Sequence, residues 1–164
     1  MYNQILRELR SEYHLIIAES IEEIPEDDLD DVTYDLAFHY PHSDDLNQAI
    51  NYLSLAGKQA SEIFAHEEAI KYMDQALEKL EFKSSKPKVM KTKLEALKDL
   101  GDFTESASRW EESLKHYEAA IELSEEVGEE GETPAIYRNM GNVNIHLGRY
   151  DKAEDCLKKS LTLY

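Results

Sequence analysis

Two histidines, His39 and His42, lie three residues apart and next to the carboxylates of Asp44 and Asp45. Imidazole and carboxylate groups can bind a metal ion, but only as a set of several ligands in a fixed geometry. Pro41 stands between the two histidines and breaks a helix there, so the two rings need not share a face. We interpret both histidines as helix-end residues and expect no metal site.

The sequence also shows no arrangement of residues that is typical of a catalytic site. The acidic pairs Glu67–Glu68 and Glu111–Glu112 are sequence neighbours, and neighbours on a helix diverge by about 100 degrees, so neither makes an acid/base pair. No Ser-His-Asp set stands out, and no G-x-x-x-x-G-K-[ST] phosphate loop occurs. The single cysteine, Cys156, is best interpreted as a small apolar residue of a helix. We therefore predict a protein that is not an enzyme and that needs no cofactor.

The charge balance narrows the choice of partners. The formal net charge is -17, and seven of the ten residues from Glu22 to Asp31 are acidic. An acidic protein repels phosphate backbones, so we expect no nucleic-acid partner. The exception is a run of lysines, interpreted as a solvated helix start. Its members are Lys83, Lys86, Lys88, Lys91 and Lys93.

Composition favours an all-α protein in the cytoplasm. Only 6 glycines and 4 prolines occur, and hairpin signals such as Asn-Gly are absent, which argues against sheets. No apolar run is long enough to span a membrane, and the N-terminus lacks a signal peptide. We expect a cytoplasmic protein with no membrane partner.

The elements that carry these residues are repeated. The segment Leu100–Ala120, LGDFTESASRWEESLKHYEAA, returns forty positions later as Met140–Ser160, MGNVNIHLGRYDKAEDCLKKS, and an earlier copy covers Ala56–Ala76. Self-similarity at this period indicates stacked two-helix units. Corresponding positions keep their type: Gly57, Gly101 and Gly141; Trp110 and Tyr150; Ser113 and Ala153; Ala76, Ala120 and Ser160.

Helix packing explains the small residues. Gly101 and Gly141 lie within a first helix, where glycine costs about 1 kcal/mol relative to alanine. We expect a bulkier residue there to clash with the second helix, at Ser113 and Ala153. We also expect the rings of Trp110 and Tyr150, which open the second helices, to fill the wedge between helices.

This spacing resembles the tetratricopeptide repeat family, whose pattern is W-x2-L-G-x2-Y, then A-x3-F, then P. The resemblance covers residues 86–164 and extends to 32–82. The chain departs from the pattern at Leu97 and Tyr137, which replace the first aromatic residue, and in lacking the closing proline. The resemblance implies a right-handed α-α superhelix of about eight antiparallel-paired helices. It also implies a non-enzymatic module that binds a protein or peptide.

Periodicity and capping signals place the helices. We predict an N-terminal amphipathic helix and acidic linker over 1–31 and a repeat domain over 32–164. Expected caps are Asp44 or Asp45, Ser84 or Ser85, and Thr133. The apolar positions of the first helix are Tyr2, Ile5, Leu6, Leu9, Tyr13, Ile16 and Ile17, with Ser20. The predicted helices cover 2–23, 32–40, 46–64, 67–82, 87–106, 109–127, 133–147 and 150–163.

A second resemblance covers Ile5–Leu80. The fragments Leu36–Tyr40, Ala56–Ala60 and Phe64–Ala69 resemble a block in large signalling ATPases whose ATPase module precedes a repeat sensor. This resemblance implies an alternative function, as a sensor or regulatory fragment of a signalling ATPase or of a nucleotide cyclase-linked regulator.

The first resemblance implies that partner contacts lie on the first helix of each pair, around its glycine. Arg138 and Asn142, four residues apart, share a helical face and are similar to part of a carboxylate clamp. Lys98 is instead paired with Asp102, which would repel a carboxylate, so the full clamp is absent. An unused polar groove stays open as an alternative. The predicted groove residues are Asn51, Ser54, Lys58, Lys98, Asp102, Glu105, Arg138, Asn142 and His146.

The C-terminal helix is poorly suited to be an exposed end. Repeat arrays need a terminal cap with a polar outer face. Leu157, Leu161, Leu163 and Tyr164 do not provide one. We therefore expect this helix to meet a further repeat or another chain, including a second copy.

Overall fold

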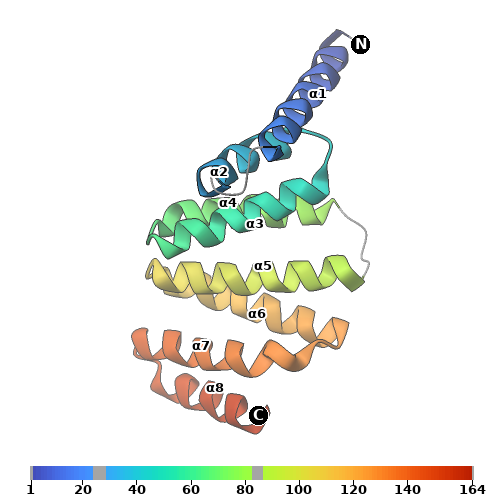
Figure 1. Ribbon diagram of the computed structural model, residues 1–164. Helices are drawn as coiled ribbons and strands as arrows, with labels where there is room; N and C mark the ends of the chain where they lie inside the picture. The colour runs from blue at the N-terminus through green and yellow to red at the C-terminus, as the bar shows by residue number, and fades with distance from the viewer. Residues whose placement is uncertain (1, 24–28, 83–86, 164) are drawn as a thin grey trace. The chain divides into compact units, whose positions relative to one another are not determined.

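A computed structural model of the chain describes residues 2–23, 29–82 and 87–163. These residues form helices and turns without strands, which confirms the predicted all-α fold (Figure 1). The helices are α1 (Tyr2–Glu22), α2 (Leu29–His39), α3 (Leu46–Glu62), α4 (His66–Glu81), α5 (Pro87–Ser106), α6 (Trp110–Val127), α7 (Thr133–His146) and α8 (Tyr150–Leu163). Two short 3-10 helices, η2 (Tyr40–His42) and η3 (Glu130–Glu132), precede α3 and α7.

The helices group into two compact units, residues 1–82 and 83–164. In the first unit α3 packs on α4, and α1 and α2 pack together at one side. In the second unit α5 packs on α6 and α7 on α8, with α6 and α7 joining the two pairs. The predicted boundary between residues 31 and 32 stays a prediction.

Each helix pair turns through the same backbone geometry. The turn residues Phe64, Ser108 and Gly148 all have a positive φ, of 62°, 59° and 69°. The amide that follows each one donates back to a carbonyl five positions earlier, as from Arg109 to Thr104 at 2.8 Å. Glycine occupies this left-handed position without strain, but here it does so only at the third turn. The common turn confirms that the three segments are copies of one helical hairpin.

Close packing between the helical glycines and the second helix is confirmed, but the clash lies one helical turn beyond the predicted Ser113 and Ala153. A Cβ at Gly101 would overlap the ring of Tyr117, and one at Gly141 would lie 2.8 Å from Cγ of Leu157. Ser113 packs where expected, because its hydroxyl donates to the carbonyl of Gly101 at 2.9 Å.

In the first unit, Asp45 is the cap of α3. Its carboxylate accepts from the amides of Asn47 and Gln48, both at 3.0 Å. The core around α2 contains Val32, Leu36, Tyr40, Ala18 and Ala49. This cluster joins α1, α2 and α3 into one unit.

Two details of the prediction were wrong. Tyr150 does not fill a wedge but is 69% exposed, since no helix of the described chain packs beyond α8 to cover it. Thr133 is the first residue of α7 rather than its cap, because the preceding η3 turn already brings Glu132 into helical geometry. Its hydroxyl bonds instead with that of Ser124, at 3.2 Å. Ser84 and Ser85 lie outside the described residues.

Candidate functional site

The predicted groove residues of the second unit divide into two sets. Lys98, Asp102 and Glu105 lie on α5 and are half-buried, whereas Arg138, Asn142 and His146 lie on α7 and are exposed. The two helices contact each other.

Lys98 is held at one end of this side by an ion pair. Its ammonium nitrogen lies 2.8 Å from Oε2 of Glu132, the residue before α7. This hydrogen bond raises the pKa of Lys98 and lowers the pKa of the Glu132 carboxyl. Lys98 therefore helps to fix α7 against α5.

The carboxylates of Asp102 and Glu105 converge on a buried tyrosine. The hydroxyl of Tyr117 lies 2.6 Å from Oδ1 of Asp102 and 2.9 Å from Oε2 of Glu105. The amide nitrogen of Asn139, on α7, donates to the same Asp102 oxygen at 3.0 Å. Burial, followed by the charge and hydrogen bond of Asp102, raises the pKa of Tyr117 far above its usual range. Burial also raises the pKa of the Glu105 carboxyl. This network ties α5, α6 and α7 together.

The α7 residues present a polar row. Arg138, Asn142 and His146 follow one another at four-residue steps, so they share a helical face. The His146 ring stacks on the indole of Trp110, with centroids 4.5 Å apart and an angle of 9° between the planes. Trp110 thus fills space between successive helix pairs, and with His146 it forms a flat aromatic surface at the end of the row.

The remaining predicted groove residues lie on α3 of the first unit. Asn51 and Lys58 are exposed, and Ser54 is half-buried. Their participation in one groove with the α7 row stays a prediction.

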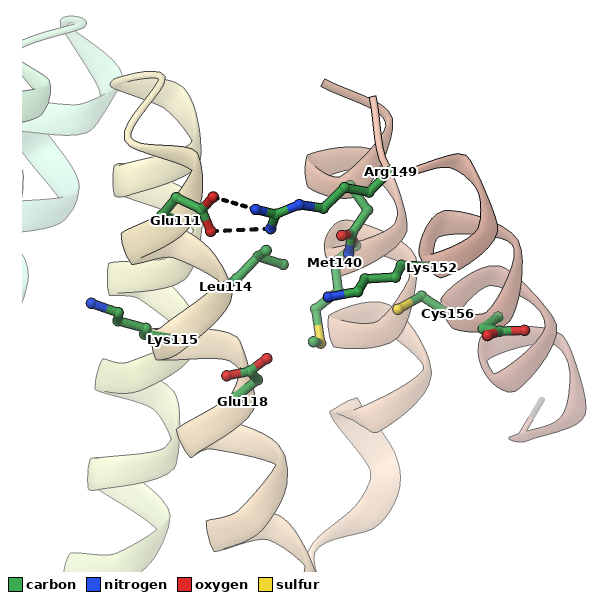
Figure 2. A pocket seen from close by; sticks show the side chains of 10 residues that line it. Glu111, Leu114, Lys115, Glu118, Met140, Arg149, Lys152 and Cys156 are labelled. Atoms are coloured by element: carbon green, nitrogen blue, oxygen red, sulfur yellow. Dashed lines mark hydrogen bonds and ion pairs between the residues drawn. The ribbon is translucent and has the colours of Figure 1, made fainter. Parts of the chain in front are cut away.

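A separate pocket lies between α6, α7 and α8, and the sequence did not reveal it (Figure 2). Its volume is about 420 Å³. The guanidinium of Arg149 donates to both carboxylate oxygens of Glu111, at 2.6 and 3.1 Å, and so joins the start of α8 to that of α6. The sequence gives a partial signal for this ion pair, because Arg149 occupies the same repeat position as Arg109. Its partner Glu111, thirty-eight positions away, could not be inferred from the sequence. The lining residues are Glu111, Leu114, Lys115, Glu118, Met140, Asn144, Arg149, Lys152, Asp155 and Cys156.

The pocket has balanced charge, with three cationic and three acidic side chains. Asn144, which is buried, donates to the carbonyl of Met140 at 2.8 Å. Its side-chain oxygen has no hydrogen-bond partner among the residues that the structure describes. Burial raises the pKa of the Cys156 thiol, which disfavours the thiolate. This pocket therefore favours neither an anion nor a cation.

Three histidines meet in the first unit. His14 of α1 lies with its Nδ1 atom 3.0 Å from Nδ1 of His39, and its ring stacks on that of His42 at 5.0 Å. The expected helix-end positions of His39 and His42 are confirmed. Burial, then the neighbouring His42 and His39, lowers the pKa of His14. Across residues 2–23, 29–82 and 87–163, no set of three or more His, Cys, Asp or Glu side chains has the arrangement of a metal site.

The C-terminal helix exposes part of its apolar surface. Leu161 is 77% exposed and Leu163 is partly exposed, whereas Leu157 is half-buried beneath Gly141. Tyr164 lies outside the described residues. Association through this helix stays a prediction.

Comparison with known proteins agrees with this architecture. Residues 93–164 match the family model described as tetratricopeptide repeat. The fold is similar to the crystal structure of the TPR domain of Arabidopsis FLU, with a TM-score of 0.66 and 17% sequence identity. That match covers 71% of this chain and 95% of the other. No curated protein sequence matches the chain. The predicted resemblance to tetratricopeptide repeats is thus confirmed, whereas nothing found supports the resemblance to signalling ATPases.

None of the described helices combines the length and the apolar character that crossing a membrane requires.

Proposed function

We propose that this chain is a protein-interaction scaffold that binds an extended or helical segment of a partner along α5 and α7. Tetratricopeptide repeat domains generally act as non-catalytic scaffolds for protein partners. The observation that carries the proposal is the exposed row of Arg138, Asn142 and His146, which ends at the aromatic surface of Trp110.

The row defines what the partner must offer. An arginine guanidinium binds a carboxylate through two parallel hydrogen bonds, and the Asn142 amide adds a further donor. The stacked rings of Trp110 and His146 provide a flat surface for an apolar side chain. The carboxylates of Asp102 and Glu105 lie at the groove edge and favour a cationic residue. The partner segment should therefore carry mixed charge, with an acidic group facing Arg138.

The test is a double substitution, Arg138→Ala with Asn142→Ala, in the full chain. Binding is measured by calorimetry against a partner segment isolated by pull-down with the wild-type protein. Because both residues are exposed, the fold should persist, and affinity should fall by roughly tenfold or more. The matched control is Lys71→Ala, which removes an exposed cation from α4 of the first unit. Unchanged affinity in the folded double variant would exclude this row from the binding surface.

The alternative function, a sensor fragment of a signalling ATPase or cyclase-linked regulator, rests on the sequence fragments alone. The same pull-down addresses it, since capture of an ATPase or cyclase chain would support that role. The predicted cytoplasmic location is part of the proposal as well, since the scaffold has a single cysteine and needs no disulfide.

A further inference from the structure

Helix α1 carries apolar residues on two opposite faces, and its inner face is covered. Ala18 is fully buried in the cluster with Val32 and Leu36, and Leu15 and Ile21 pack against that cluster. The carboxylate of Glu22, at the end of α1, accepts from the hydroxyl of Tyr52 at 2.7 Å. The inner face therefore attaches α1 to its own unit.

The opposite face is open to solvent. We call it the outer stripe, and each of its side chains is between 42% and 64% exposed. Figure 1 shows the N-terminal half of α1 extending beyond α2. So short a helical projection is marginal in water unless something packs against it. The outer stripe consists of Leu6, Leu9, Tyr13, Ile16 and Ile17.

The spacing of the outer stripe indicates the kind of surface that covers it. Leu6, Leu9, Tyr13 and Ile16 follow at steps of three, four and three residues. The same alternation continues in the sequence to Tyr2 before and Ser20 after. Alternating steps of three and four are the heptad pattern by which one helix packs along another in a coiled coil. The 21 residues of α1 correspond to three heptads.

We propose that the outer stripe pairs with the outer stripe of a second copy of this chain, forming a parallel two-helix coiled coil. A heptad seam is complementary to itself, so no further surface is required. The charge of α1 also permits this pairing. The helix holds two arginines and four glutamates, so it carries only a small part of the chain's net charge of -17. The inner face points away from the seam, so each copy keeps its own unit clear of the other helix.

The residues beside the seam favour the parallel arrangement. In a parallel pair, Glu12 of one copy lies beside Ile17 of the other, and the glutamate methylenes can cover the isoleucine. An antiparallel pair that matches Leu6 with Ile16 would instead place Glu12 near Glu12 of the other copy. Like charges so placed destabilise a helix pair.

A lipid surface fits the outer stripe less well. Helices that lie on membranes carry many Lys and Arg residues on the face opposite the apolar one. In α1 that opposite face is the buried inner face. A net charge of -17 also repels anionic headgroups.

The test is sedimentation equilibrium of the full chain. Wild-type protein should dimerise, and Leu9→Glu with Ile16→Glu should weaken the dimer by roughly a hundredfold or more. Both positions are exposed, so the variant keeps its fold, which its circular dichroism checks. The matched control is Leu161→Glu, which changes an exposed leucine of α8 and should leave the dimer unchanged. A monomeric wild-type chain would overturn the proposal, as would a dimer that only Leu161→Glu disrupts.

Two further measurements define the seam. Raising the salt concentration should strengthen the dimer, because salt screens repulsion between two acidic chains while the seam is apolar; a dimer weakened by salt would contradict an apolar seam. With Cys156→Ser in the background, Leu9→Cys should form a disulfide between copies under mild oxidation, since residue 9 meets residue 9 only in the parallel pair.

Flotation of the wild-type monomer with phosphatidylserine vesicles would assign the stripe to lipid and overturn the proposal.

Discussion

At the scale of single residues, Gly101 and Tyr117 determine how the first hairpin of the second unit, α5 with α6, closes. The glycine leaves the space that the tyrosine ring occupies, and the tyrosine hydroxyl reaches two carboxylates of the helix that contains the glycine. The ring is fully buried, and its position is set at both ends. Neither partner can change size without moving the other.

We expect Gly101→Ala to lower the free energy of unfolding by up to about 2 kcal/mol. Alanine gains about 1 kcal/mol in helix propensity, but its Cβ overlaps the Tyr117 ring, and overpacking typically costs about 1–3 kcal/mol. The Tyr117 ring cannot move aside without losing its bonds to Asp102 and Glu105, so the cost should exceed the gain. Urea unfolding followed by circular dichroism measures the difference.

The matched control for this prediction is Gly131→Ala. A Cβ at Gly131 meets no atom within 4 Å, and its φ is not positive, so stability should change little. If Gly101→Ala is as stable as wild type, the Tyr117 ring relaxes freely and the packing argument fails.

The glycine positions could be predicted because glycine recurs at the same position in several copies of the repeat. The network around Tyr117 could not, because Asp102 meets Asn139, which is thirty-seven positions away on another helix. The spacing along one helix shows which residues share a face, but not which of them bond inward. That is why Lys98, Asp102 and Glu105 were predicted as groove residues on the same terms as Arg138.

At the scale of elements, the helix bounds could be predicted closely because caps and turns are local signals. Asp45 marks the start of α3, because its carboxylate accepts hydrogen bonds from two otherwise free amides of the first turn. The exposure of Tyr150 could not be predicted in the same way. The equivalent Trp110 is covered by α7, so burial at this position depends on the next element and not on the ring itself.

Docking of α1 should depend on pH through the histidine cluster. The pKa of His14 is lowered by burial and by His42, His39 and Arg10, so the folded state favours the neutral ring. Below the pKa of about 6.5 for an unfolded histidine, the unfolded chain takes up a proton first. The free energy of unfolding should therefore fall as the pH decreases from about 7 to about 5.

The measurement is urea unfolding at these two pH values for wild type and His14→Gln. The variant should lose part of the pH dependence, because its residue 14 no longer titrates. Equal slopes for wild type and His14→Gln would show that the cluster does not report on folding.

At the scale of the whole molecule, the two units have separate cores. Leu53 lies fully buried in the first unit, and Leu100 in the second. Repeat proteins gain stability both within each repeat and at interfaces between neighbours. Which contribution dominates decides whether the chain unfolds in one step or two.

We expect the cores to dominate, so that Leu53→Ala and Leu100→Ala act on different unfolding transitions. Truncation of a fully buried leucine costs about 2–5 kcal/mol in the unit that contains it. Trp110 is the only tryptophan and belongs to the second unit, so its fluorescence reports that unit alone, whereas circular dichroism reports both. Leu100→Ala should move the fluorescence midpoint to lower urea. Leu53→Ala should leave that midpoint in place and shift only the remaining dichroism change. If both substitutions move the fluorescence midpoint equally, the coupling between repeats exceeds the stability of either core, and the chain unfolds as one cooperative unit.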